Sequence, residues 1–151
     1  MDDAANLDSF REPAPVDCAA FKVRRLARRI TRIFDEALAP HGLTIGQFGM
    51  LGQLRRRRGI GIAALAERLA LDASTLSRLF RPLAASGLLT VQPDPDDRRA
   101  KQLWLTDAGA ERVRAAFPDW QAAQARISEH LGAPRLAALR FTLDDAYQHL
   151  D

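Results

Sequence analysis

The stretch LDASTLSRLFRPLAASGLLTVQPDPDDRRAKQLWLT, residues 71–106, changes its periodicity halfway along. Up to residue 86, apolar residues recur at the spacing of an amphipathic helix, and Gly87 then supplies the left-handed conformation in which many helices end. After the glycine, LLTVQ and KQLWL have the pattern of two short strands, with PDPDDRR as a charged hairpin tip between them. The stretch therefore predicts a helix over residues 73–86 followed by a β-hairpin.

A shorter helical pattern over residues 62–70 precedes this helix, and only Leu71 and Asp72 separate the two. Two helices joined by so short a turn cross each other, as in a helix-turn-helix, and the second helix presents its leading turns outward. The hairpin that follows then has the position of a wing. We expect a winged helix-turn-helix lobe over residues 44–106, in a fold that is mainly α with a small β-hairpin wing.

Long amphipathic helices are predicted on both sides of this lobe. One covers residues 17–40, and residues 107–151 supply two more, the first of them bent or interrupted near Pro118. The apolar faces of the terminal helices are larger than a small lobe needs to cover itself. We therefore expect them to form an α-helical dimerisation region within a single domain, residues 17–151, preceded by a flexible lead-in over residues 1–16.

Inside the lobe, Thr44 and Gln47 have the spacing of a capping box, which predicts a helix that begins there and closes at Arg55–Arg58. Three glycines recur at every third position of this helix: Gly46, Gly49 and Gly52. Because each glycine costs a helix about 0.8–1 kcal/mol relative to alanine, their placement predicts another backbone close by. Gly59 and Gly61 are expected to form a turn.

The charge of the chain is unevenly distributed. Residues 18–104 hold sixteen basic and seven acidic side chains, a net charge of +9, whereas the whole chain carries +3. A basic centre between acidic ends suggests a polyanionic partner such as nucleic acid, although a solvated arginine-rich surface would give the same count. The same two alternatives hold for the run RRRRG at residues 55–59, which would also suit the negative end of the preceding helix.

Several function classes find no support in the composition. No apolar stretch approaches the roughly 20 residues of a membrane-spanning helix, and the acidic start differs from a secretory signal, so we expect a cytoplasmic protein with no membrane partner. One cysteine and three scattered histidines give neither a disulfide framework nor a metal site. Without a catalytic constellation or a phosphate-cradling glycine loop, we expect no enzyme and no cofactor.

The second helix of the helix-turn-helix carries polar side chains on the side that its leucines do not use. Hydroxyls suit phosphate oxygens and base edges, and an arginine can bond a guanine in two places at once, so Arg78 is the expected base reader. The alternative is that the hydroxyls cap the helix and the arginines solvate it. The candidate DNA-binding residues of this helix are Ser74, Thr75, Ser77, Arg78 and Arg81.

Residues 18–115 resemble the MarR family of bacterial winged helix-turn-helix regulators. The most specific part is the pattern GLL…P…DRR…L.LT..G, here Gly87, Leu88, Leu89, Pro95, Asp97, Arg98, Arg99, Leu103, Leu105, Thr106 and Gly109. The resemblance implies a homodimer whose two lobes meet successive major grooves of a palindromic operator in double-stranded DNA. It also implies that Asp97 braces the wing while Arg98, with Arg99 as the alternative, reaches the minor groove.

The resemblance further implies a repressor that leaves DNA when a small, often aromatic or phenolic, effector enters a cleft between the dimer helices and the lobe. Candidate residues for that pocket are Phe21, Arg25, Phe48 and Trp104, although aromatic residues at helical spacing also pack in cores. Two alternative functions stay open. Cys18, followed by Lys22, would suit a redox-sensing repressor, and the basic surface would suit a winged-helix module that docks acidic proteins without reading DNA.

Overall fold

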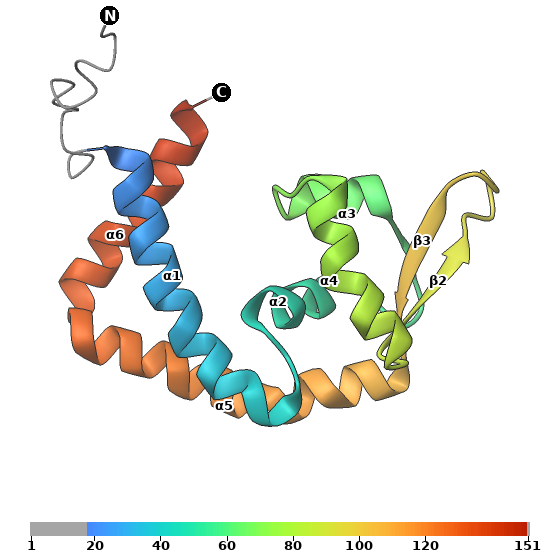
Figure 1. Ribbon diagram of the computed structural model, residues 1–151, viewed down its shortest axis with the longest axis horizontal. Helices are drawn as coiled ribbons and strands as arrows, with labels where there is room; N and C mark the ends of the chain where they lie inside the picture. The colour runs from blue at the N-terminus through green and yellow to red at the C-terminus, as the bar shows by residue number, and fades with distance from the viewer. Residues whose placement is uncertain (1–17, 151) are drawn as a thin grey trace, which may run out of the picture.

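Helices make up most of the chain, and a small antiparallel sheet lies at one end of the molecule (Figure 1). The structure is a computed structural model that describes residues 18–150, so the predicted lead-in at residues 1–16 lies outside the described residues. The elements are α1 (Ala19–Leu38), the 3-10 turn η2 (Ala39–His41), α2 (Ile45–Gln53), β1 (Ile60–Gly61), α3 (Ile62–Arg68), α4 (Ala73–Ala85), β2 (Leu89–Pro93), β3 (Lys101–Leu105), α5 (Asp107–Leu131) and α6 (Ala133–His149).

The predicted helix-turn-helix is formed by α3 and α4. Asp72, the N-cap of α4, has an extended backbone and accepts a hydrogen bond from the N–H of Thr75, which fixes where the helix begins. At the other end Gly87 has φ +72°, the left-handed conformation expected there. The chain then enters the sheet directly, which confirms the winged helix-turn-helix architecture.

The sheet has the order β1-β3-β2, with antiparallel pairing throughout. Both predicted strands are present, and Leu89 and Leu103 are almost fully buried beneath them. The prediction of a simple turn at Gly59 and Gly61 was wrong, because Ile60 pairs with Leu103 and adds a third strand. So short a strand has no alternation of its own and forms because the outer edge of β3 offers it hydrogen-bonding groups.

The helix α2 confirms the predicted capping box, with the Thr44 hydroxyl accepting from the Gln47 N–H at 3.2 Å and the Gln47 side chain accepting from the Thr44 N–H at 3.1 Å. Its predicted end at Arg55–Arg58 was wrong. The helix ends at Gln53, because Leu54 is extended and its side chain is buried.

The prediction of a backbone passing close to three glycines of α2 was also wrong. A Cβ placed on Gly46 would meet the side chain of Leu79, at 3.3 Å, rather than a backbone. At Gly49 and Gly52, a Cβ would find no atom of the described residues within 4 Å. In this chain those two glycines therefore face open space.

Two hydrophobic clusters hold the structure together. The larger one fills the lobe and includes Leu76 and Leu103, while the smaller one joins Phe34 of α1, Ile127 of α5 and Leu136 of α6. Trp120 of α5 packs against both clusters. The helical base made by α1, α5 and α6 is thus continuous with the lobe, which lies over the first half of α5 (Figure 1).

The helix α5 runs through Pro118 without the predicted interruption. Pro118 and Arg114 are both exposed, so water can satisfy the carbonyl that the proline leaves without its usual donor. Beyond α5, only Leu136 of α6 is buried. Among the described residues, no helix is long and apolar enough to cross a membrane.

Candidate nucleic-acid interface

The start of α4 is organised around the carboxylate of Asp72. The Ser74 hydroxyl donates to its Oδ1 at 2.5 Å, and the Thr75 hydroxyl and N–H donate to Oδ2 and Oδ1 at 2.6 and 2.8 Å. The acceptor at the helix start is therefore Asp72, and not the serine and threonine proposed as caps. Because both hydroxyl hydrogens point to Asp72, the free lone pairs of Ser74 and Thr75 suit the amino groups of bases better than phosphate oxygens, which are acceptors themselves.

These donors also set the ionisation of Asp72. The Ser74 hydroxyl, followed by the Thr75 hydroxyl and N–H, holds the pKa of Asp72 well below its usual range. A carboxyl whose pKa is lowered by folding contributes stability above its unfolded pKa of about 3.9. That contribution is lost as the pH falls from there through the folded pKa.

We expect Asp72→Ala to lower the midpoint of thermal unfolding clearly at about pH 6, and to lower it less at about pH 3. The reason is that at pH 3 the unfolded parent binds a proton at Asp72 that the folded, still ionised cap does not bind, so the cap favours folding less. Circular dichroism of both proteins at both pH values measures the gap. Asp96→Ala removes an equal charge from the wing tip without touching a cap and serves as the control; a gap for Asp72→Ala that widens in acid would contradict the assignment.

The other predicted residues of α4 share one face. At 100° per residue, Ser74, Ser77, Arg78 and Arg81 lie within roughly a quarter to a third of the helix circumference, with Thr75 at its edge. The guanidinium of Arg78 folds back onto Ser74, with Nη2 donating to Oγ at 3.3 Å. Arg81 is exposed, and its side chain has no partner among residues 18–150. Leu76 and Leu83, on the opposite face, are buried and fix the orientation of this polar face.

Two aspartates shape the tip of the wing. The carboxylate of Asp97 accepts from the N–H of Arg99 at 3.0 Å, as a brace of the wing would. Asp94 accepts from the N–H of Asp96 at 2.9 Å and from the side chain of Gln102 at 2.8 Å, and these donors lower its pKa, with the Asp96 N–H contributing most. Sequence reasoning missed the role of Asp94, although an aspartate two residues before a free N–H is a known turn former.

The arginines of the wing are presented to solvent. Arg98 and Arg99 follow this tightly bonded turn and are both exposed. Within the part of the chain that the structure describes, neither guanidinium has a hydrogen bond or an ion pair. The tip thus holds two cations on an ordered turn with their donors available to an external anion.

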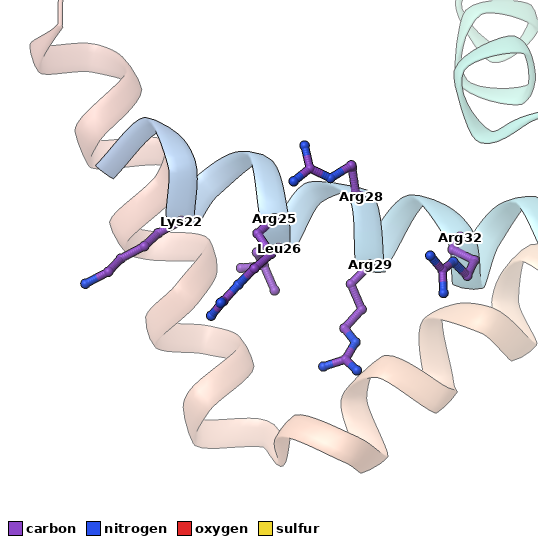
Figure 2. Close-up of a pocket in the computed structure, with 6 residues that line it drawn as sticks. All are labelled: Lys22, Arg25, Leu26, Arg28, Arg29 and Arg32. Atoms are coloured by element: carbon purple, nitrogen blue, oxygen red, sulfur yellow. The ribbon is translucent and has the colours of Figure 1, made fainter. Parts of the chain in front are cut away.

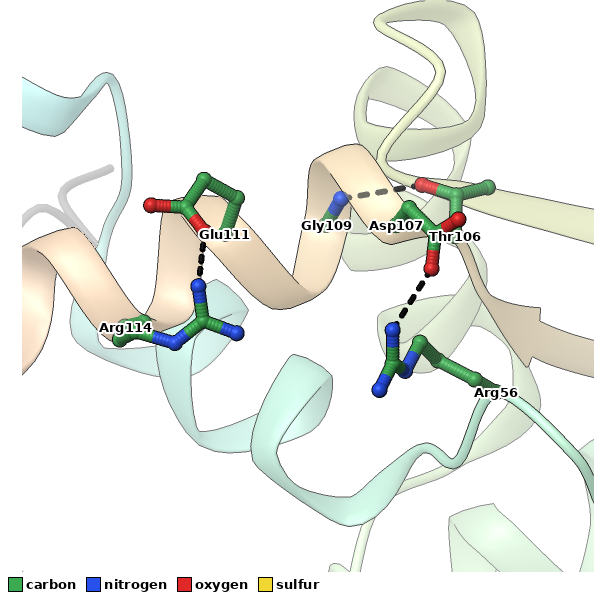
Figure 3. Close-up of polar contacts among 6 residues, drawn as sticks. All are labelled: Arg56, Thr106, Asp107, Gly109, Glu111 and Arg114. Carbon is green, nitrogen blue, oxygen red and sulfur yellow. Dashed lines mark hydrogen bonds and ion pairs between the residues drawn. The ribbon is translucent and has the colours of Figure 1, made fainter.

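The run at residues 55–58 is exposed throughout and is divided between cations that have a partner and cations that have none among residues 18–150. Arg55 donates to the carbonyls of Gly52 and Leu54 at 3.0 and 2.9 Å, and Arg56 pairs with Asp107 at 2.8 Å (Figure 3). Arg57 and Arg58 are exposed and have no side-chain partner within residues 18–150. Arg55 and Arg56 are therefore engaged with other parts of the protein, and only Arg57 and Arg58 have guanidinium groups available for phosphate contact.

The junction of α4, the wing and α5 depends on Thr106. Its hydroxyl donates to the carbonyl of Gly87 at 2.7 Å and accepts from the N–H of Gly109 at 3.0 Å (Figure 3). One side chain thereby connects the turn that follows α4 to the first turn of α5. On the same stretch of α5, Glu111 and Arg114 form an exposed ion pair.

The four residues predicted for an effector pocket lie in different surroundings. Phe48 is in the core of the lobe, only 8% exposed, and stacks on Trp120 with ring centroids 6.0 Å apart. Trp104 packs against Gly59 in the sheet, and its buried Nε1 has no partner among the described residues. Phe21 is exposed on α1, and Arg25 lines a groove on the same helix.

Trp120 was not predicted from the sequence, yet it is the aromatic centre of the molecule. It stacks with Phe34 of α1, Phe48 of α2 and Phe117 of α5, at centroid distances of 6.3, 6.0 and 5.5 Å. The available signal was the pair Phe117 and Trp120 at helical spacing. Cys18, the candidate redox residue, is exposed at the N-cap of α1. Among the described residues, no group of three potential metal ligands comes together.

Residues 43–101 match the profile of the MarR family. The chain is 32% identical over 113 residues to the HTH-type transcriptional repressor NicR of Pseudomonas putida. This match covers 70% of this chain and 72% of NicR. The chain is 33% identical over 108 residues to the HTH-type transcriptional regulator TtmR of Methylorubrum extorquens, covering 72% of this chain and only about half, 51%, of TtmR. The crystal structure of the M. tuberculosis regulator MosR in complex with DNA is similar, with a TM-score of 0.74 and 30% identity, over 88% of this chain and 98% of that one.

Proposed function

The chain belongs to the MarR family of DNA-binding transcriptional regulators, and on that premise we propose that it is a homodimeric repressor of a palindromic operator, released by a small aromatic or phenolic effector. In this proposal residues 44–106 read DNA, while residues 17–40 and 107–151 hold two copies together. The observation that supports this proposal is the arrangement of α4 and the wing. The same lobe presents the polar face of α4, with Arg78, and the exposed arginines of the wing, Arg98 and Arg99, whose guanidinium groups have no partner among residues 18–150.

The two parts of this surface have separate tasks. Arg78 lies in the leading turns of α4, where a recognition helix meets base edges in the major groove, and Ser74 is beside it. Arg98 and Arg99 stand on the wing, which can lay a cation beside the minor groove. Asp97 orders the turn that presents them, so it supports DNA contact without bonding the phosphates itself.

Dimer formation is supported by apolar surface that the single chain leaves uncovered. Large apolar side chains are exposed on all three helices of the base: Phe21, Val23, Phe117, Phe141, Leu143 and Tyr147. On α6 the exposed fractions of Phe141 and Tyr147 reach 73% and 67%, although this helix is well formed. A second copy that covers these residues would also place two lobes on one duplex.

The NicR relative is named a repressor, which supports the same direction of regulation here. Effector release rests on family likeness. Of the four candidate pocket residues, Phe21 and Arg25 are accessible on α1 for such a role, whereas Phe48 and Trp104 are engaged in packing.

Fluorescence anisotropy with the DNA upstream of its own gene tests the proposal. We expect Arg98→Ala to weaken binding to all sequences roughly equally and to reduce the salt slope by about one. We expect Arg78→Ala to lose about 1–3 kcal/mol of discrimination at defined base pairs. Arg135→Ala, an equal charge change on α6, is the control and should leave both quantities unchanged.

Three results would count against DNA reading. Equal affinities of the parent and both variants would remove α4 and the wing from the interface. Binding that ignores salt would contradict phosphate contact. Only weak, sequence-blind binding would favour instead a module that docks acidic proteins. A duplex with one half-site, bound as tightly as the palindrome, would contradict the dimer.

A further inference from the structure

The first turns of α1 carry a cationic groove that the DNA-binding proposal does not use. The groove has a volume of about 650 Å³ and is lined by Lys22, Arg25, Leu26, Arg28, Arg29 and Arg32. Figure 2 shows Lys22, Arg25 and Arg29 projecting from the same side of the helix. Five of the six lining residues are cations, none is acidic, and only Leu26 is apolar.

The cationic groove faces away from the packed side of α1. Phe34 and Ile30 pack α1 against α5, and at 100° per residue Arg25, Arg29 and Arg32 fall roughly on the other side of the helix. The groove is also remote from the proposed DNA surface, since α2 lies between α1 and the helices α3 and α4 (Figure 1). Neither the core nor the recognition helix therefore explains why these cations are gathered there.

The cations of the groove repel one another. Arg25 and Arg29 are one helical turn apart, as are Arg28 and Arg32, and like charges at this spacing destabilise a helix. The acidic residues of α1, Asp35 and Glu36, line a neighbouring groove that shares Arg28 and Arg32 with this one, so of these arginines only Arg25 and Arg29 lie outside the groove with the acidic residues. Within residues 18–150, the guanidinium groups of these four arginines have no hydrogen bond or ion pair. An anion in the groove would relieve the repulsion and satisfy the donors.

We propose that the cationic groove binds a small anion with several negative charges, held through its phosphate or carboxylate groups by Arg25, Arg29 and Arg32. Guanidinium groups bind the oxygens of both anions bidentately, which a row of lysines would not do. The volume lies within the range of small-molecule sites, and the scarcity of apolar lining disfavours an uncharged aromatic compound. This site shares Arg25 with the candidate effector residues, and anion binding there does not depend on DNA binding.

Isothermal titration calorimetry of the full chain without DNA tests this site, with inorganic triphosphate in one arm and citrate in the other. The double variant Arg25→Gln and Arg29→Gln should bind at least about tenfold more weakly, since it loses two charge-assisted contacts. The matched control, Arg24→Gln with Arg135→Gln, removes the same charge outside the groove and should stay within about twofold of the parent.

The two arms identify the chemistry: binding of triphosphate alone assigns phosphate, and binding of citrate alone assigns carboxylate. A parent that binds neither anion overturns the proposal, and so does equal weakening in both double variants, which would show diffuse attraction only. Helical content by circular dichroism confirms that the variants fold.

Discussion

Gly109→Ala should destabilise the protein by about 3 kcal/mol, near the upper end of overpacking substitutions. A Cβ at this position would collide with the carbonyl oxygen of Leu88 and would lie 2.8 Å from Cδ1 of Leu105. The first of these is backbone, which cannot rotate away as a side chain could. The substitution therefore forces α5 away from the segment that joins α4 to the wing.

Urea unfolding followed by circular dichroism measures the loss, and Gly49→Ala is the matched control. Gly49 also lies in a helix, but a Cβ there meets no described atom within 4 Å. The same chemical change should stabilise the protein at that site by about 0.5–1 kcal/mol, because alanine loses less conformational entropy than glycine. A Gly109→Ala protein as stable as the parent would show that α5 can shift freely beneath Leu88.

Leu103→Ala should cost about 3 kcal/mol of stability and loosen the wing. Leu103 is fully buried in the middle strand of the sheet. It pairs with Ile60 of β1 on one side and with Val91 of β2 on the other. Shortening it leaves a cavity where the three strands meet the core of the lobe. The wing would lose its anchor, so we expect operator affinity to fall as well.

The same urea titration, combined with anisotropy on the operator, measures both effects. Val91→Ala, at the cross-strand neighbour that is 37% exposed, is the control and should cost less than about 1 kcal/mol. If Val91→Ala and Leu103→Ala were equally destabilising, the wing would not be anchored through the buried side of β3.

The parts of this fold that local chemistry determines could be predicted from the sequence. Thr44 and Gln47 satisfy each other's backbone donors, and Gly87 adopts the one conformation that its neighbours require, so both helix ends follow from nearby residues. The strands 89–93 and 101–105 follow from the turn between them. In each case the deciding atoms lie within a few residues of one another.

The features that were missed depend on distant contacts. The strand β1 exists because β3 has a free edge, and the end of α2 depends on burial of Leu54, neither of which leaves a periodic trace. Glycines in α2 were interpreted as close approaches, but glycine alone does not reveal whether a neighbour is present. A close approach to another backbone occurs instead at Gly109, whose neighbour Leu88 lies beyond the whole wing in the sequence.

At the candidate site, sequence composition identified the exposed cations but not the groups that order them. Arg78 and Arg98 could be proposed because basic residues on the outer side of a predicted element have few alternatives. Asp72 and Asp94 were harder to assign, because an acidic residue beside a basic surface is easily taken for mere charge balance. Their role depends on which N–H and O–H groups the backbone brings within reach.

The two hydrogen bonds of the Thr106 hydroxyl have a mechanical consequence. Because one hydroxyl oxygen is hydrogen-bonded to both Gly87 and Gly109, a tilt of α5 is transmitted to the end of α4 and to the start of the wing together. In the proposed homodimer, α4 and the wing of one lobe would then move together as a rigid body, so that the spacing between the two lobes changes while the shape of each lobe stays the same. Regulation of such a dimer would act on the distance between its two DNA-contacting surfaces.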